Sequence, residues 1–222
     1  MKKIIFISTL LIVALLFCFG FKEKTEECRL FDLPIEYNNI ELVISKSMPK
    51  GGNLVCCADF TTDFNFLKSA EKRLVYNCVS DGKLYERKSP KNIGVFTWYN
   101  NRYHFSYNKQ DLKKAADNNG MGFLQWMVIY NYKPCKVKTV KSKNHFRVLA
   151  ELNGKLHFIE ANQKMRMTEF VNELVKMKVK YAIYLDTGKG WETFYYRKNG
   201  KKIIKHNTIL PFPYRTNYLY FK

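Results

Sequence analysis

The chain has 222 residues, with 38 Lys or Arg against 19 Asp or Glu, which gives a formal net charge of +19. Hydrophobic residues make up 46% of the chain and aromatic residues 16%, enough to bury a core, which argues against wholesale disorder. Eleven Gly and six Pro exclude a collagen-like or linker protein, and six Cys are too few for a disulfide-dense mini-scaffold. The basic excess favours anionic partners such as phosphate groups, nucleic acid or an anionic membrane surface.

The N-terminus has the layout of an export signal. Two lysines precede an almost unbroken apolar run over residues 4–21, and a polar segment follows. We therefore divide the chain into residues 1–20, a signal peptide or membrane anchor, and one domain over residues 21–222. Lipidation at Cys18 stays open. A retained anchor also stays open, because the run is long enough to span a bilayer. The protein is expected to be exported to the periplasm, cell envelope or medium, with membrane contact through its N-terminal segment.

The first half of the domain predicts strands joined by tight turns. Asp81-Gly82 is a strong hairpin signal, and residues 99–101 predict a second hairpin. A helix is predicted over residues 110–118, with Asn108 capping its start and Gly120 taking the left-handed position beyond its end. After a polar lead-in over residues 21–35, the predicted strands cover residues 38–45, 54–58, 73–79, 83–86, 93–98, 102–105 and 122–130.

The second half predicts another hairpin, a helix and a short strand. Asn153-Gly154 is a type I′ turn signal between strands over residues 147–152 and 156–160. Thr168 is expected to cap a helix whose apolar residues recur at the spacing of a core-facing stripe. A buried strand over residues 181–185 follows.

Two prolines shape the expectation for the C-terminus. Pro211 and Pro213 argue against a central strand over residues 209–221, so we expect an edge segment that closes over the core. The alternative brings Arg215 and Asn217 to the rim of a site. Many hairpins with two or three packing helices predict an α+β fold with mixed or antiparallel sheets, in a single domain after the signal.

The stretch over residues 181–191 carries the most chemical information. Its strand delivers the carboxyl group of Asp186 into a turn that contains Gly188 and Gly190. Glycines let the backbone approach a ligand and expose N–H groups to an anion, and a carboxylate at a strand end can serve as acid, base, nucleophile or metal ligand. The alternative is a plain turn closed by an Asx hydrogen bond.

The order of motifs in this half resembles a known family. Arg147 opens a strand, Asn153-Gly154 forms a hairpin, Met-Thr-Glu-Phe begins a helix at residues 167–170, and Ala-Ile-Tyr-Leu-Asp-x-Gly fills residues 182–188. This order is similar to the phosphodiester glycosidases, whose relatives include the enzyme that uncovers mannose phosphate by removing N-acetylglucosamine. The likeness spans roughly residues 40–222, including segments 57–60, 94–97 and 122–125, although the family's triple glycine is reduced here to two.

The resemblance implies an exported hydrolase of a sugar–phosphodiester linkage. Asp186 would act as nucleophile, base or cation stabiliser, with Asp59 or Asp63 as its partner, and Arg147 would hold a phosphate by a two-pronged charged hydrogen bond. The residues predicted to contact substrate are Gly188, Gly190, Trp191, Phe60, Gln125 and Trp98. The partner would be a phosphorylated or phosphodiester-linked glycan.

Each of these assignments has a plainer alternative. Asp59 and Asp63 are also typical of surface loops, Trp98 of a core, and Arg147 of a structural ion pair. At the level of function, the alternative is a non-catalytic envelope protein that binds anionic glycans through a basic face. No nucleic-acid-binding pattern accompanies the lysine clusters, so no nucleic-acid partner is expected. The cofactor stays unknown: a divalent cation is possible, but no ligand spacing predicts a metal site.

Overall fold

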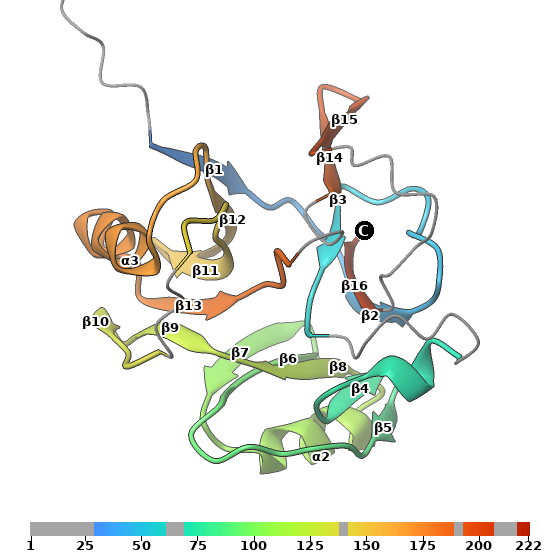
Figure 1. The fold of residues 1–222 in the computed structure, drawn as a ribbon. Coiled ribbons are helices and arrows are strands. Elements are labelled where there is room, and N and C mark those ends of the chain that lie inside the picture. Colours follow the sequence, from blue (N-terminus) through green and yellow to red (C-terminus); the bar gives the residue numbers. More distant parts are fainter. Residues whose placement is uncertain (1–28, 61–68, 138–141, 189–192, 207–216) are drawn as a thin grey trace, which may run out of the picture.

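The computed structural model describes residues 29–60, 69–137, 142–188, 193–206 and 217–222 (Figure 1). Within these ranges the chain is mostly β, with 47% strand, 12% helix, three antiparallel sheets and two α-helices. The α+β prediction is therefore wrong. The hairpin signals at Asp81-Gly82 and Asn153-Gly154 do form turns with positive φ at all four residues. Each turn of this kind joins two strands, whereas two amphipathic segments form α-helices in the part of the chain that the structure describes.

The first sheet has six strands in the order β1-β12-β11-β13-β9-β10. At its centre the Asn153-Gly154 hairpin pairs Arg147 with Glu160 across the two strands. The polar composition of residues 21–35 hides β1, which the sequence analysis treats as a lead-in. The strands are β1 (Leu30–Pro34), β9 (Met127–Tyr130), β10 (Lys133–Pro134), β11 (Arg147–Leu152), β12 (Lys155–Ala161) and β13 (Tyr181–Tyr184).

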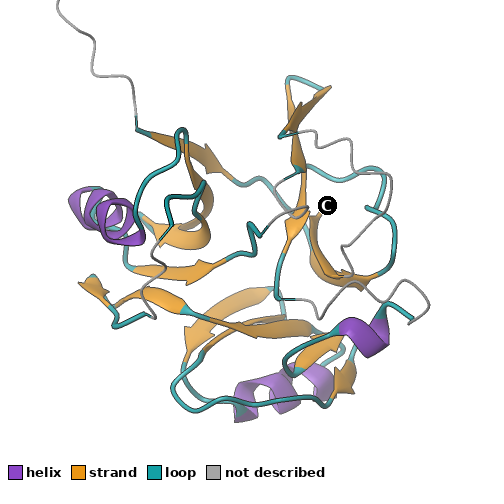
Figure 2. Ribbon diagram, viewed as in Figure 1, coloured by secondary structure: helices purple, strands orange, loops and turns teal. Residues whose placement is uncertain are grey.

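Helix α3 (Met167–Lys176) packs against this first sheet (Figure 2). Its Phe170 is fully buried in one apolar cluster with residues of β11, β12 and β13. The helix begins before the predicted Thr168 cap, and its N-cap is Arg166. The Glu169 carboxylate accepts a hydrogen bond from the Arg166 backbone N–H at 3.1 Å, which satisfies a donor that the helix start would otherwise leave open.

The second sheet has the order β15-β14-β3-β16-β2. Its β16 lies between β3 and β2, so the expectation of an edge segment at the C-terminus is wrong. Pro211 and Pro213 precede this strand in sequence, and the rule that excludes proline from central strands therefore does not reach residues 217–221. The strands are β2 (Ile40–Ile44), β3 (Leu54–Cys57), β14 (Phe194–Lys198), β15 (Lys201–Lys205) and β16 (Asn217–Phe221).

The third sheet has the order β5-β4-β8-β6-β7 and packs against α2 (Gln110–Asp117). As predicted, the Asn108 side chain accepts the Gln110 N–H, at 3.1 Å. Asn119, not Gly120, takes the left-handed position after the helix. Gly120 is needed because a Cβ there would collide with the Trp98 carbonyl oxygen. The remaining elements are η1 (Glu71–Arg73), β4 (Cys78–Ser80), β5 (Lys83–Tyr85), β6 (Gly94–Tyr99), β7 (Arg102–Ser106) and β8 (Met121–Gln125).

The three sheets share one core. Leu149 of the first sheet, Leu219 of the second and Phe123 of the third belong to the same buried cluster. The single strand predicted over residues 122–130 is in fact β8 and β9, which lie in different sheets and separate at Trp126. At Trp126 the chain therefore passes directly from the third sheet into the first. This crossing places the end of β8 beside the ends of β3 and β13.

Candidate functional site

Two aspartates meet where the first and second sheets join. The Asp186 backbone N–H, just after β13, donates to the Ala58 carbonyl oxygen, just after β3, at 3.0 Å. The Leu185 N–H donates in turn to the Arg147 carbonyl oxygen at 3.0 Å, which brings the start of β11 to the same place. Asp59 and Asp186 are only 1% and 5% exposed. The sheet junction therefore gathers two carboxyl groups and a guanidinium in the interior.

Asp59 is held by the side chain of Asn217 at the start of β16. Its N–H donates to Asn217 Oδ1 at 2.7 Å, and Asn217 Nδ2 donates back to the Asp59 carbonyl oxygen at 3.1 Å. The carboxyl Oδ1 accepts the Phe60 N–H at 2.6 Å. Oδ2 is buried and makes no hydrogen bond to a described residue, although the Tyr76 backbone amide lies near enough to lower the pKa of this carboxyl. The Asp59 backbone is fixed while one carboxyl oxygen is left to bind a proton or a ligand.

Both carboxyl groups have raised pKa values. Burial raises the pKa of Asp186 to about 6, against the opposing effects of the Gly188 N–H, which donates to Oδ1 at 2.9 Å, and of the Arg147 charge. Burial raises the pKa of Asp59 well above its usual range, and the charge of Asp186 adds to that effect. The protonation of one carboxyl group is therefore coupled to that of the other, and burial favours the protonated form of both.

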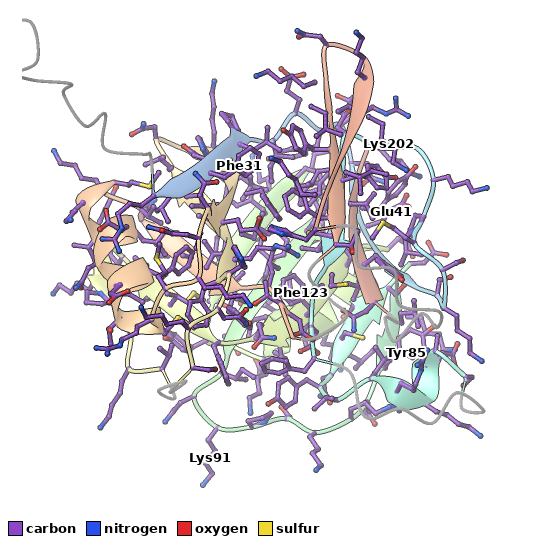
Figure 3. The ribbon with its side chains drawn as sticks, turned by 45° about the horizontal axis from the view of Figure 1, so that its top comes forward. Phe31, Glu41, Tyr85, Lys91, Phe123 and Lys202 are labelled. Atoms are coloured by element: carbon purple, nitrogen blue, oxygen red, sulfur yellow. The ribbon has the colours of Figure 1, made fainter. Side chains whose placement is uncertain are left out.

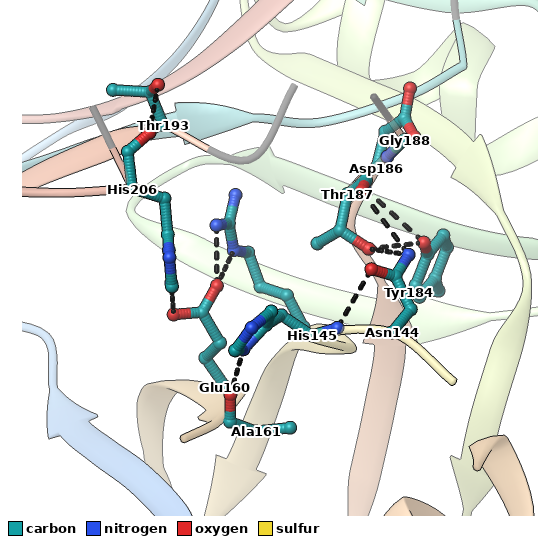
Figure 4. Close-up of polar contacts among 11 residues, drawn as sticks. Asn144, His145, Glu160, Ala161, Tyr184, Asp186, Thr187, Gly188, Thr193 and His206 are labelled. Carbon is teal, nitrogen blue, oxygen red and sulfur yellow. Dashed lines mark hydrogen bonds and ion pairs between the residues drawn. The ribbon is translucent and has the colours of Figure 1, made fainter. Parts of the chain in front are cut away.

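Behind this pair lies a buried ion network (Figure 4). Arg147 Nε and Nη2 donate to Glu160 Oε1 at 3.1 and 2.6 Å, and His206 Nε2 lies 2.9 Å from Glu160 Oε2. The guanidinium also lies over the Phe194 ring, 4.6 Å from its centroid. Burial favours the protonated form of Glu160, but the Arg147 charge and the His206 hydrogen bond outweigh it and keep the pKa of Glu160 below its usual value. The network therefore holds a positive and a negative charge at fixed positions.

Side chains, rather than glycines alone, shape the turn after β13. The Tyr184 hydroxyl and Thr187 Oγ1 lie 2.8 Å apart, and Asn144 Nδ2 donates to the Thr187 carbonyl oxygen at 3.3 Å (Figure 4). Burial raises the pKa of Tyr184 to about 12, and the neighbouring Asp186 charge acts in the same direction. Tyr184 therefore remains a neutral hydroxyl, and the turn that carries Asp186 is fixed before any ligand arrives.

An aromatic cluster adjoins the two aspartates. The Phe60 ring meets the Trp126 ring at 5.1 Å edge to face, and Trp126 stacks on Tyr184 at 5.5 Å and 25°. Phe60 directly follows Asp59, and Tyr184 lies two residues before Asp186. This apolar neighbourhood accounts for the desolvation that raises both carboxyl pKa values. Aromatic faces of this kind can also stack on the apolar face of a sugar.

The structure brings several predicted site residues together. They are Asp59, Phe60, Arg147, Asp186 and Gly188. Gln125 is fully buried at the end of β8, and its Oε1 accepts the N–H of Trp126 at 2.8 Å. Asp63, Gly190 and Trp191 lie outside the described residues.

Trp98 lies elsewhere in the fold. It is a nearly buried residue of β6, its Nε1 donates to Asn39 Oδ1 at 3.0 Å, and its ring meets that of Tyr37 edge to face. It lines a separate cavity of about 750 Å³ between β2 and the third sheet, which Asp59 and Asp186 do not line. Trp98 therefore has the core role that was its alternative, and Trp126 is the tryptophan beside the aspartates.

Sequence analysis missed three residues of this site, of which Glu160 was within its reach. A two-residue turn at Asn153-Gly154 fixes the register of its hairpin, and counting outward from the turn pairs Arg147 with Glu160. No such local signal exists for Tyr184 and His206, because their neighbours come from distant segments. Asn217 lies beside Asp59, as the alternative expectation for the C-terminus had it, whereas Arg215 lies outside the described residues.

Two searches of the described ranges bear on metals and membranes. In that part of the chain no three His, Cys, Asp or Glu residues are grouped as metal ligands. None of the helices described there is long and apolar enough to cross a membrane. Cys56 and Cys57 are both fully buried in β3.

Comparison with known proteins supports the fold and nothing finer. No protein-family model matches the chain, and no curated protein matches it. Among solved structures, the chain is similar to the zebrafish N-acetylglucosamine-1-phosphodiester alpha-N-acetylglucosaminidase catalytic domain, auto-inhibited by its pro-peptide, with a TM-score of 0.58 and 12% identity. The match covers 90% of this chain and 85% of that domain. The resemblance noted in the sequence therefore holds at the level of the fold.

Proposed function

We propose that the protein is a hydrolase that cleaves a sugar–phosphodiester linkage at Asp186 and Asp59. The observation that carries the proposal is that two buried aspartates lie at one sheet junction, where the Asp186 N–H donates to the carbonyl oxygen of Ala58, the residue before Asp59, and where burial raises the pKa of both carboxyl groups. Paired carboxyls with separated pKa values are how proteins obtain an acid and a base in one site. The choice of substrate class comes from the fold shared with a phosphodiester glycosidase domain.

The reaction follows from the charges of the site. Breaking the bond between the anomeric carbon and the phosphate oxygen builds positive charge on the sugar, which the ionised Asp186 would stabilise as a nucleophile or as a counter-charge. The protonated Asp59 would donate its proton to the departing phosphate oxygen, and the carboxylate that this leaves would accept a proton from the attacking water. Phosphate is a good leaving group, so a modest acid suffices. The ring cluster at Phe60 and Trp126 would pack against the sugar.

Arg147 has a different part in this mechanism from the one first expected. Two of its nitrogen atoms already donate to Glu160, so we assign it a positioning role in place of a two-pronged grip on phosphate. Its positive charge lowers the pKa of Asp186 and thereby favours the ionised form. Glu160 and His206 hold that charge in place. Export remains part of the proposal, and the signal-like layout of residues 1–20 supports it.

The test is turnover of synthetic sugar phosphodiesters with and without divalent cations. Asp186→Asn and Asp59→Asn should each lower kcat/KM by about a hundred- to ten-thousand-fold, the range for loss of one acid–base group. Activity of the wild type should rise with pH through about 6, as Asp186 loses its proton. Asp117→Asn, an exposed aspartate on α2, is the matched control and should leave turnover unchanged.

Two results would contradict the proposal. One is unchanged turnover in Asp186→Asn. The other is a wild-type protein that binds phosphorylated glycans in low salt, releases them in high salt, and turns over none of them. That second result would favour the alternative, a glycan-binding envelope protein, which the excess of basic residues supports.

A further inference from the structure

A basic hairpin projects from the second sheet, and the proposed function makes no use of it. It consists of β14, the Asn199-Gly200 turn and β15, residues 194–205. β14 pairs with β15 along its whole length, but with β3 only at Tyr195 and Tyr196. The last residues of the hairpin therefore extend beyond the sheet as two paired strands, which Figure 1 shows above the body of the molecule.

All five charged residues of the hairpin are basic and exposed. Within the described part of the chain, no Asp or Glu forms a salt bridge with any of them. The register places Arg197 opposite Lys202, and Lys198 opposite Lys201. Like charges directly opposite each other destabilise a strand pair. The five residues are Arg197, Lys198, Lys201, Lys202 and Lys205.

Protection of a sheet edge does not account for this arrangement. Charged residues on an edge strand do prevent association with other strands. Acidic residues opposite the lysines would serve equally well, and they would stabilise the hairpin through cross-strand attraction. The Arg197 guanidinium donates to the Gly52 and Gly200 carbonyl oxygens and Lys202 Nζ lies 3.9 Å from the Tyr195 ring centroid, which offsets the repulsion between Arg197 and Lys202. The opposed Lys198 and Lys201 give up local stability, and the charge pattern points outward to an anionic partner.

An exposed aliphatic side chain among the lysines narrows the choice of partner. Ile204 is 50% exposed, between the partly buried Ile203 and the exposed Lys205. The register puts Ile204 on the same face of the hairpin as Arg197 and Lys202. An exposed apolar residue beside basic ones is typical of surfaces that lie at the headgroup level of a bilayer, where basic side chains reach the phosphates and the apolar side chain enters the acyl boundary. A soluble phosphate polymer offers nothing for Ile204 to enter.

The hairpin also lies next to the strand through which the N-terminal segment enters the domain. The Phe31 ring of β1 lies 5.4 Å from the Tyr196 ring, and Lys205 Nζ lies 5.9 Å from the Phe31 ring centre. Figure 3 shows Phe31 and Lys202 in the same half of the view, with Lys91 at the opposite end. The apolar run over residues 4–21 ends nine residues before Leu30, a reach of at most about 30 Å.

We infer that the basic hairpin is a docking surface for an anionic phospholipid bilayer. Its lysines and Arg197 bind lipid phosphates, and Ile204 enters the interface. A chain held by its apolar run would then rest on the membrane through this hairpin. The inference does not depend on the proposed hydrolase function, because the hairpin's exposed face is separate from the aspartate pair.

The experiment measures binding of the full chain to vesicles of phosphatidylcholine, with and without about one third phosphatidylglycerol. Each basic residue at an anionic bilayer contributes roughly a five-fold change in binding. The variant Lys201→Gln/Lys202→Gln should therefore lose about 25-fold of the preference for anionic vesicles. Lys91→Gln/Lys113→Gln removes the same charge from exposed positions elsewhere and should keep the preference. Ile204→Ser should weaken binding to anionic vesicles at unchanged charge.

The outcomes distinguish docking through the basic hairpin from a non-specific effect of the protein's net charge. Melting temperatures of all variants confirm folding, and Lys201→Gln/Lys202→Gln should melt no lower than wild type, because a like-charge pair is relieved. Equal losses in the two double variants would overturn the inference, since net charge alone would then be responsible. Binding of a soluble phosphodiester polymer with no preference for anionic vesicles would also overturn it and would assign the hairpin to a polymer.

Discussion

The aspartate site and the basic hairpin use charge in opposite ways. In the site, the Arg147 and Glu160 side chains are 0% and 4% exposed, and their charges are fixed by direct hydrogen bonds. In the hairpin the basic groups are exposed and face one another across the two strands. Within the described residues, the contacts of Arg197, Lys202 and Lys205 are to carbonyl oxygens and aromatic rings rather than to acids. Interior charges interact strongly because little water screens them, whereas surface charges act together on a distant partner. A single buried charge can therefore affect stability on its own, whereas exposed charges affect binding only as a group.

The largest expected effect comes from breaking the buried pair. Arg147→Ala should lower the free energy of unfolding by about 3–5 kcal/mol, because Glu160 would be left as a buried charge with only His206 beside it. Chemical denaturation monitored by circular dichroism measures this change. A double variant, Arg147→Met/Glu160→Leu, should recover much of the loss, since it removes both charges.

An exposed ion pair supplies the matched comparison. Arg29 lies 3.0 Å from Glu173, and its side chain is 41% exposed. Arg29→Ala should therefore cost less than about 1 kcal/mol. Similar losses for Arg29→Ala and Arg147→Ala would show that burial does not separate the two classes of charge in this protein.

The next effect is a dependence of stability on pH that comes from the buried aspartates. The pKa of Asp186 is raised from 3.8 to about 6 in the folded protein, so the folded state binds this proton more tightly than the unfolded state. The stability that this proton contributes is complete below about pH 4 and is lost as the pH rises to about 6, a change of about 3 kcal/mol. The raised pKa of Asp59 acts in the same direction.

Asp186→Asn isolates this contribution. At pH 7 the variant should be more stable than wild type by up to about 3 kcal/mol, and at pH 4 the difference should vanish. Glu160 acts with the opposite sign, because its pKa is lowered, but its effect is common to both proteins and cancels in the comparison. A constant difference between the two proteins over pH 4–8 would contradict the raised pKa of Asp186.

The smallest effect is expected in the hairpin. Lys202→Glu places a carboxylate opposite Arg197 and should raise the free energy of unfolding by up to about 1 kcal/mol, because the attraction outweighs the lost contact of Lys202 with the Tyr195 ring. Lys91→Glu, at an exposed position outside the sheets, is the control and should change stability by less than about 0.5 kcal/mol. No gain in Lys202→Glu would mean that the opposed charges of the hairpin carry no stability penalty.

Sequence patterns found the strand ends of the site but not how they meet. The strand before Asp186 and the strand that Arg147 opens were predicted correctly, because alternation and the Asn153-Gly154 turn are local signals. The contact between Asp186 and the end of β3 joins two sheets and has no local signature. The preferred expectation of an edge segment at the C-terminus was wrong for a related reason, since the two prolines nearby bias only their own residues, whereas the alternative did bring Asn217 to the site.

The fold class was mispredicted although most of the individual helices and hairpins were predicted correctly. Both predicted helices exist, and most predicted hairpins form, but the balance between them lies far toward strand. The continuous apolar run over residues 122–130 gave no sign of the break at Trp126, because each half is buried on both faces and periodicity cannot mark the change of sheet.

That break has a mechanical consequence. β8 and β9 are halves of one run, so the first and third sheets cannot shift independently without moving the indole of Trp126, which stacks on Tyr184. A displacement of the third sheet would be transmitted through the Trp126 ring to the turn that carries Asp186. Trp126 is thus an intrinsic fluorophore at this junction, and its fluorescence should change when the first and third sheets move relative to each other.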